Sequence, residues 1–339
     1  MKDLVIGDVH FGIKTNNISW LEQQLEFFNK TVMPLISQHD RVVFLGDLFD
    51  IRYSVNTQVG LEVKKLVRNL AKLNKPIYFI AGNHDFYSPV METEEYNAYS
   101  LIFGNEFVKE YPNVHFVTTE PVWDNDTLFL PWYYTENRER YIKTINSYRI
   151  NSVKRTTLIY CHSDLAAWDE EMLTTKGDIT VISGHIHYPY MNLDDKIYNI
   201  GSCCAFTFSD VNQDKYIYTV ENCLITNKYE NTVTPKFKRW YNEQIFILTP
   251  QDFENTYTQL CINKDNINKA KYIERLKEIR SENIGASIKV NIIENEYEDI
   301  VNGGENFNTN IDDYIRLNMP EHLLDKYEHI NQKLNEEIE

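Results

Sequence analysis

Residues 3–10 read DLVIGDVH, an apolar run that ends in glycine and is followed at once by Asp8 and His10. The run predicts a buried strand. Two residues that stand two positions apart in an extended chain point to the same side, so this aspartate and this histidine form a pair. Similar patterns recur at 41–50 (RVVFLGDLFD) and at 76–85 (PIYFIAGNHD). Open α/β sheets place their functional sites at the carboxyl ends of strands, which is where these polar residues fall.

Helical patterns separate the three strands. Apolar residues recur at helical spacing over 18–37 and 57–73, which predicts an amphipathic helix after each of the first two strands. Strands that alternate with helices indicate a largely parallel sheet with crossover helices. Further strands are expected over 113–117, 127–132, 156–162, 179–185 and 196–201, and an antiparallel pair over 215–220 and 226–232.

The pattern changes near residue 237, and we expect three regions. Residues 1–236 form the main domain, and residues 240–298 form a small α+β domain. The elements expected within the small domain are a strand, a helix and a strand, over 244–249, 264–283 and 286–294. A Gly- and Asn-rich linker over 302–310 leads into a helical region over 305–339. An apolar stripe of this region packs on its own chain or docks on a partner, and it consists of Leu323, Leu324, Tyr327, Ile330 and Leu334.

The composition of the chain describes a globular protein. It has 339 residues, of which 42% are hydrophobic, and a formal net charge of −16. Taken alone, this charge counts against nucleic-acid binding, although bound metal would neutralise some carboxylates and a partner could supply a positive groove. No apolar run is long enough to cross a membrane and the first ten residues are not a signal peptide, so a cytoplasmic protein is expected. Five cysteines without a C-x-x-C pair indicate free thiols.

Five short segments combine residues of the types that bind metals. They contain Asp8 and His10, Asp47 and Asp50, Asn83 with His84 and Asp85, His162, and His185 with His187. Each segment alone is weak evidence, because a D-x-H or H-x-H pair is often structural. Together, at successive strand ends, they predict one site. A mixture of oxygen and nitrogen donors suits manganese, iron or zinc better than calcium.

Glycines precede four of these residues: Asp8, Asp47, Asn83 and His185. Because glycine adopts conformations that other residues avoid, we expect the chain to turn tightly at each of these positions.

The motifs D-x-H, G-D-x-x-D, G-N-H-D, H and G-H-x-H, in this order over residues 8–187, resemble the calcineurin-like metallophosphoesterase superfamily. Within it, the chain is similar to SbcD-type nucleases and bacteriophage recombination endonucleases. GDLFDIRYS (46–54) resembles the second motif of those nucleases, and LPWYY (130–134) resembles a Pro-Trp element. The regions after residue 240 resemble a capping domain and an ATPase-binding tail. The resemblance implies a two-sheet α/β sandwich, with a small α+β capping domain and a C-terminal helical tail.

The resemblance also implies two divalent metal ions, with Mn²⁺ expected and Mg²⁺, Fe²⁺ or Zn²⁺ as alternatives. One ion would be held by Asp8, His10 and His187, and the other by Asn83, His162 and His185. Asp47 would bridge the two ions. His84 would be the catalytic histidine, oriented by Asp85. Asp50 departs from part of the family, which has histidine at this position, and this leaves the role of the position open.

The function implied is that of a DNA nuclease, a 3′–5′ exonuclease and single-strand endonuclease that hydrolyses phosphodiesters with a metal-activated water. Its expected partners are DNA, an SbcC-like coiled-coil ATPase and a second copy of the chain. The second copy would be contacted near 57–73 or after Gly82. The complex would act in the cytoplasm of the cell or of a phage host. One alternative is a small-molecule phosphodiesterase or phosphatase. Ile51 and Asp85 argue against the Ser/Thr phosphatases, which usually have Arg and Glu there. The other alternative is a non-catalytic binding module, which would be expected to have lost ligands.

Overall fold

The computed structural model describes residues 1–50, 54, 56–86, 97–132, 157–163, 179–192, 196–283 and 287–293. The chain divides into two units. The first unit comprises Met1–Arg239 and Phe253–Thr258, and the second comprises Trp240–Asp252 and the described residues from Gln259 onward. The expected linker over 302–310 and helical tail over 305–339 lie outside the described residues, and the expected domain limits stay predictions.

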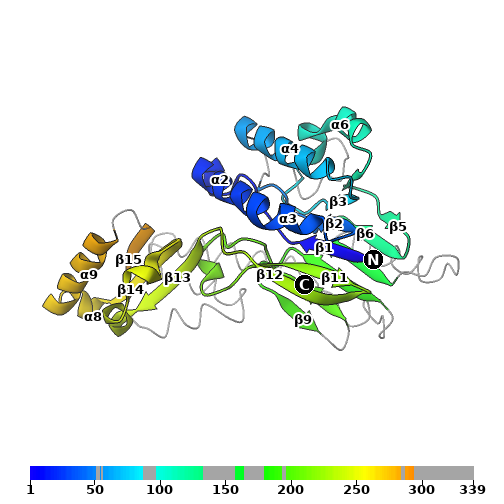
Figure 1. Ribbon diagram of the computed structural model, residues 1–339. Helices are drawn as coiled ribbons and strands as arrows, with labels where there is room; N and C mark the ends of the chain where they lie inside the picture. Colours follow the sequence, from blue (N-terminus) through cyan, green and yellow to red (C-terminus); the bar gives the residue numbers. More distant parts are fainter. Residues whose placement is uncertain are drawn as a thin grey trace, which may run out of the picture. The chain divides into compact units, whose positions relative to one another are not determined.

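The first sheet has the strand order β12-β11-β1-β2-β3-β4 (Figure 1). Its strands are β1 (Lys2–Ile6), β2 (Arg41–Phe44), β3 (Ile77–Ile80), β4 (Val114–Val117), β11 (Tyr216–Glu221) and β12 (Leu224–Glu230). The four strands β1 to β4 run parallel, while β11 and β12 are antiparallel neighbours, as the sequence predicts.

The second sheet has the order β5-β6-β7-β8-β10-β9. Its strands are β5 (Val122–Asp124), β6 (Thr127–Leu130), β7 (Leu158–His162), β8 (Thr180–Gly184), β9 (Tyr190–Asn192) and β10 (Ile197–Asn199). The four inner strands are parallel and the two edge strands are antiparallel to their neighbours. The short edge strands β5 and β9 were not predicted. The expected two-sheet α/β sandwich is confirmed.

Helices cover the first sheet on the side away from the second. They are α1 (Ile13–Asn16), α2 (Ile18–Phe27), α3 (Met33–Ile36), α4 (Thr57–Ala71), α5 (Ala98–Ile102) and α6 (Gly104–Glu110). The helix expected over 18–37 is present, but a π-helical turn, Phe28–Val32, joins α2 to α3. Pro34 follows this turn and has no N–H to donate to a carbonyl four residues earlier. The side chains of Asn17 and Asn56 cap α2 and α4 by accepting backbone hydrogen bonds.

Alternation along the strands divides the core. In β1, Leu4 and Ile6 pack with the helices, whereas Val5 belongs to the cluster between the sheets. That central cluster also includes Leu45, directly after β2, and Ile182 in the middle of β8. Both sheets therefore share one apolar interior, which holds their carboxyl ends next to each other. No helix among the described residues is long and apolar enough to cross a membrane.

The region from Lys236 onward corrects one prediction. A sheet of order β13-β14-β15 has the strands β13 (Lys236–Tyr241), β14 (Thr256–Asn263) and β15 (Ser287–Ile293), with helices α8 (Lys264–Ile267) and α9 (Ala270–Glu282). The strand expected over 244–249 is wrong, because 3₁₀ helices occupy Asn242–Phe246 and Pro250–Phe253. The Arg275 guanidinium donates to the carbonyls of Ile245 and Leu248, which supplies those carbonyls with partners outside a sheet. The strand of this region is β14, which the sequence analysis missed.

Candidate metal centre

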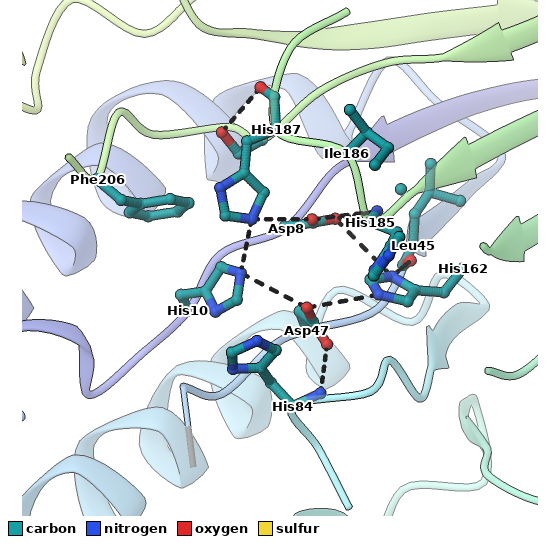
Figure 2. A network of polar contacts seen from close by, with 12 residues as sticks. Asp8, His10, Leu45, Asp47, His84, His162, His185, Ile186, His187 and Phe206 are labelled. Atoms are coloured by element: carbon teal, nitrogen blue, oxygen red, sulfur yellow. Dashed lines mark hydrogen bonds and ion pairs between the residues drawn. The ribbon is translucent and has the colours of Figure 1, made fainter. Parts of the chain in front are cut away.

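The five predicted segments meet at the carboxyl ends of strands from both sheets (Figure 2). Strand β1 leads to Asp8 and His10, β2 to Asp47 and Asp50, β3 to Asn83 and His84, β7 ends on His162, and β8 leads to His185 and His187. Because the first sheet supplies three segments and the second supplies two, the site exists only where the two sheets adjoin.

The first cluster consists of Asp8, His10 and His187, whose ligand atoms lie within 4.8 Å of one another. His10 Nε2 is 3.1 Å from His187 Nε2, and His187 Nε2 is 3.5 Å from Asp8 Oδ2. Two imidazole nitrogens that face each other beside a buried carboxylate form a donor set suited to a divalent cation. The residues expected to hold the first metal are thus brought together.

The second cluster consists of Asp47, His162 and His185. Asn83 joins it, because Asn83 Oδ1 is 3.0 Å from His162 Nε2 and 3.0 Å from His185 Nδ1. The His162 ring is oriented by its other nitrogen, since Nδ1 lies 2.7 Å from the Leu45 carbonyl oxygen. A ring held at one nitrogen in this way presents the opposite nitrogen to a metal.

Asp47 lies between the two clusters. Its Oδ2 atom is 3.6 Å from His10 Nε2 and 3.4 Å from His162 Nε2. Its Oδ1 atom accepts a hydrogen bond of 2.8 Å from the His84 backbone N–H. One carboxylate oxygen therefore faces donors of both clusters, which is the position that a bridging ligand requires.

Three ligand residues adopt left-handed backbone conformations, with φ of 53° at His10, 47° at Asp47 and 86° at His185. Such conformations cost about 1–3 kcal/mol each in residues other than glycine and tend to collect at functional sites. They are maintained here by local hydrogen bonds. The His10 N–H donates to the Asp47 carbonyl at 2.9 Å, and the His185 N–H donates to the Asp8 carboxylate at 3.1 Å. The sequence did not predict this strain.

The glycines before the ligands serve two different purposes. Gly46 has a φ of +106° and turns the chain as predicted. Gly82 and Gly184 do not have positive φ, although a turn does begin at Gly82, whose carbonyl accepts from the Asp85 N–H at 3.2 Å. At these two positions a Cβ atom would lie 2.2 Å from Asp47 Oδ1 and 2.5 Å from Asp8 Oδ1, respectively. They are needed because ligand carboxylates pass directly over the backbone.

Burial and charge act in opposite directions on the histidines. Burial disfavours protonation of His162, but the carboxylates of Asp47 and Asp8 outweigh it and raise the pKa of His162 to about 9. Burial is likewise outweighed at His10, whose pKa is raised by Asp50, Asp47 and Asp8. At His187 burial prevails and lowers the pKa. In the absence of metal, His10 and His162 therefore attract protons that a bound cation would have to displace, whereas His187 does not.

The carboxylate that contacts the candidate catalytic histidine is Asp50. Its Oδ1 atom is 3.0 Å from His84 Nδ1. Asp85, which was expected to orient His84, instead accepts hydrogen bonds from the backbone N–H groups of Gly82 and Phe49 at 2.9 and 3.0 Å, and from the Tyr99 hydroxyl at 3.1 Å. Asp85 therefore ties the loop after β3 to the loop after β2, and its expected role in orienting His84 stays a prediction.

The pKa of Asp85 is raised to about 7, mainly by burial and further by the nearby negative charge of Asp47. The backbone donors from Gly82 and Phe49 act in the opposite direction. This carboxylate is therefore held by its hydrogen bonds in a site that disfavours its charge.

Two aromatic rings flank the histidines. Trp132, from the LPWYY stretch, has its ring centroid 4.7 Å from that of His185 and 5.8 Å from that of His162. Phe206 lies on the opposite cluster, 5.0 Å from His10 and 5.2 Å from His187. The sequence resemblance pointed to the tryptophan. It did not point to Phe206, which lies outside every motif and is recognised only by its contacts.

The fold and the donor set are those of a metal-dependent hydrolase, with adjacent clusters of possible metal ligands at the ends of strands from two mixed sheets. The model of the calcineurin-like phosphoesterase family matches residues 1–199, more than half of the chain, and the protein belongs to that family. Its chemistry is therefore metal-dependent hydrolysis of phosphoesters. The clusters fit the divalent ions that this family uses, with Asp47 between them.

Proposed function

We propose that this protein is a manganese-dependent DNA nuclease, a 3′–5′ exonuclease and single-strand endonuclease, that acts as a subunit of an SbcCD-like DNA repair or recombination complex. The observation that carries the catalytic part is the position of Asp47, with one carboxylate oxygen 3.6 Å from His10 Nε2 and 3.4 Å from His162 Nε2. The DNA part is supported by the SbcD-like GDLFDIRYS and LPWYY segments and by the second unit that follows the phosphoesterase domain.

The residues of the chain divide the work of phosphodiester hydrolysis between them. When bound, a pair of divalent cations supplies Lewis acidity and a water of lowered pKa. The aspartates and histidines of the two clusters would hold the ions. His84 lies beside this site, with its ring centroid 4.8 Å from that of His10. Because Asp50 occupies Nδ1 of His84, the proton for the leaving oxygen would come from Nε2.

Exposed aromatic side chains support a nucleic-acid substrate. Tyr188 directly follows the ligand His187, and its side chain is 56% exposed. Tyr190, on the edge strand β9, is 51% exposed. Bases stack on such rings with about 1–3 kcal/mol each, without reading the sequence. A small phosphomonoester would gain little from them.

The proposed partners follow from charge and exposed apolar surface. With a net charge of −16, the chain would rely on an SbcC-like ATPase for part of its grip on the DNA phosphates. Leu61 on α4 and Leu101 on α5 are 55% and 71% exposed, which offers a surface for a second copy of the chain near the predicted contact region. Sedimentation of the Leu61→Glu and Leu101→Glu variants tests this, and an unchanged dimer would contradict it.

The deciding experiment is an Mn²⁺-dependent assay on a 3′-labelled DNA duplex, on single-stranded DNA and on bis-p-nitrophenyl phosphate, with and without the candidate ATPase. We expect cleavage of all three, with loss of nucleotides from the 3′ end of the duplex. Cleavage of the small diester without DNA cleavage under any condition would overturn the nuclease proposal and favour a small-molecule phosphodiesterase. Loss of every activity in the metal-saturated protein would favour the binding module.

A further inference from the structure

A buried ammonium group holds the backbone of one metal ligand. Lys215 Nζ donates a hydrogen bond of 2.8 Å to the His187 carbonyl oxygen. The same Nζ forms an ion pair of 2.6 Å with Asp210 Oδ1, and both side chains are only 4% exposed. The motifs of the family do not include these two residues, and the site described above does not use them as ligands.

The rest of the loop around His187 is held in the same manner. The backbone N–H of Ser202 donates to the His187 carbonyl at 3.1 Å. The Asn199 side-chain amide donates to the carbonyls of Ile186 and Tyr188 at 2.8 Å each. Three successive carbonyls of an irregular loop therefore have polar partners. Because residues 185–188 belong to no helix or strand, these bonds determine where the His187 imidazole lies.

The other oxygen of Asp210 extends the network to the second imidazole of the same cluster. Asp210 Oδ2 accepts hydrogen bonds from the backbone N–H groups of Phe206 and Thr207, at 2.8 and 3.1 Å. The Phe206 ring packs edge-on against both His10 and His187. The Lys215–Asp210 ion pair thus contacts the carbonyl of His187 and the backbone of Phe206, whose ring packs against His10 and His187.

A buried ion pair is not an efficient source of stability, because removing two charges from water costs about as much as their attraction returns. Here the ammonium group also has a directed hydrogen bond to a ligand residue, which indicates a role in geometry. Groups that orient metal ligands typically affect metal affinity by about 10–100-fold when they are removed.

We propose that the Lys215–Asp210 ion pair is a positioning device that sets the divalent-metal affinity of the Asp8–His10–His187 cluster, and does so selectively. The Asp47–His162–His185 cluster depends on different contacts, such as that of His162 with the Leu45 carbonyl. The inference applies to hydrolysis of any phosphoester and so does not depend on the DNA substrate.

The test is calorimetric titration of the metal-free full-length chain with Mn²⁺, supported by electron paramagnetic resonance to count bound ions. In Lys215→Met we expect one of the two sites to lose about 10–100-fold in affinity and the other to change by less than about threefold. Where the two binding steps overlap, a His185→Ala background weakens the second cluster and lets the first be titrated alone.

Lys236→Met is the matched control. Lys236 Nζ also forms two ion pairs, at 2.7 Å with Asp214 and with Glu230, but they do not involve the ligand loop. The same chemical change should therefore leave both Mn²⁺ affinities at the wild-type values. An equal loss in the control would overturn the proposal.

Asp210→Asn keeps the size of the side chain but removes its charge. If circular dichroism shows that Lys215→Met does not fold, this variant tests the positioning role of the ion pair instead. We expect it to weaken the same single site, by less than the lysine variant does. A folded variant whose two affinities both match the wild type, or both fall together, would show that the ion pair has no selective positioning role.

Discussion

Asp50 Oδ1 lies 3.0 Å from His84 Nδ1, and this contact links the last carboxylate of the second motif to the histidine of the third. A carboxylate at one ring nitrogen fixes the tautomer and directs the other nitrogen outward. Although burial opposes its ionisation, hydrogen bonds with His10 and His84 hold the pKa of Asp50 well below its usual value. Asp50 is therefore charged throughout the working pH range, and it can support a histidine that gives up and regains a proton.

Replacing His84 by alanine should separate catalysis from metal binding. His84 is not among the residues assigned to either metal, so the Mn²⁺ stoichiometry should be retained. The rate of bis-p-nitrophenyl phosphate cleavage should fall by about 10²–10⁴, the usual effect of losing a positioned proton donor. Calorimetry and initial rates on the same preparation measure both quantities. Undiminished cleavage would remove His84 from the mechanism.

Replacing Asp50 by asparagine should lower kcat by about 10–100-fold with little change in KM, because the amide preserves the size but removes the charge that orients His84. Asp85→Asn is the contrasting variant. An amide cannot accept from Gly82, Phe49 and Tyr99 as the carboxylate does, so thermal stability should fall by about 1–3 kcal/mol. If Asp85→Asn lowers kcat without lowering the melting temperature, the assignment of the two carboxylates is reversed.

Gly46→Ala should disrupt the second metal cluster. The added Cβ would lie 2.2 Å from His162 Nδ1, and the residue has a φ of +106°. Gly104→Ala is a control, because its φ of +65° is also positive, though less strained for alanine, and no atom lies within 4 Å of the new Cβ. Both variants should lose about 1 kcal/mol or more from backbone strain. Only Gly46→Ala should also lose Mn²⁺ affinity, and equal affinities in the two variants would contradict the close packing seen here.

Metal binding should compete with protons. The pKa of His162 is raised to about 9 in the metal-free protein, so metal must displace a proton at any lower pH. The affinity of the second cluster should therefore rise with pH, by up to about tenfold per unit, and level off near pH 9. The free energy of unfolding of the metal-free protein should change in the opposite direction. The stabilisation that comes from protonated His162 is complete below about pH 6.5 and is lost as the pH rises through 9. Mn²⁺ titrations at a series of pH values measure the affinity, and thermal unfolding at the same pH values measures the stability of the metal-free protein. A pH-independent affinity would contradict the predicted competition between metal and protons.

Tyr188→Ala should distinguish a polymeric from a small substrate. If bases stack on this exposed ring, loss of about 1–3 kcal/mol corresponds to a rise in KM for single-stranded DNA of roughly 5–150-fold. Cleavage of bis-p-nitrophenyl phosphate should stay within about twofold of wild type, because that substrate reaches only the metal centre. Val290→Ala, on β15, removes an exposed apolar side chain elsewhere and should change neither. Unchanged KM for DNA in Tyr188→Ala would exclude the ring as a substrate contact.

The sequence by itself predicted most strands of the main domain and the candidate ligands at their ends. Strands such as 3–8 and 179–185 are apolar runs followed directly by polar residues. Parallel strands of one sheet bring their carboxyl ends to the same edge, so periodicity was enough to predict that Asp8 and Asp47, which follow neighbouring strands, lie at one site. Runs without that context were less informative: 244–249 is as apolar as a strand, yet a 3₁₀ helix covers Asn242–Phe246, where Arg275 donates to the carbonyl of Ile245.

Only the tertiary structure showed which groups from distant parts of the chain hold the residues of the metal site in position. Local sequence placed Asp85 next to His84, but in the folded chain Asp50 also contacts the histidine, and Asp85 joins two loops. Lys215 binds the carbonyl of His187, 28 residues away, and a backbone carbonyl belongs to every residue type, so no sequence pattern marks it. The physical reason is that periodicity encodes which face of an element is buried, whereas a hydrogen bond between distant segments depends on how the sheets finally pack.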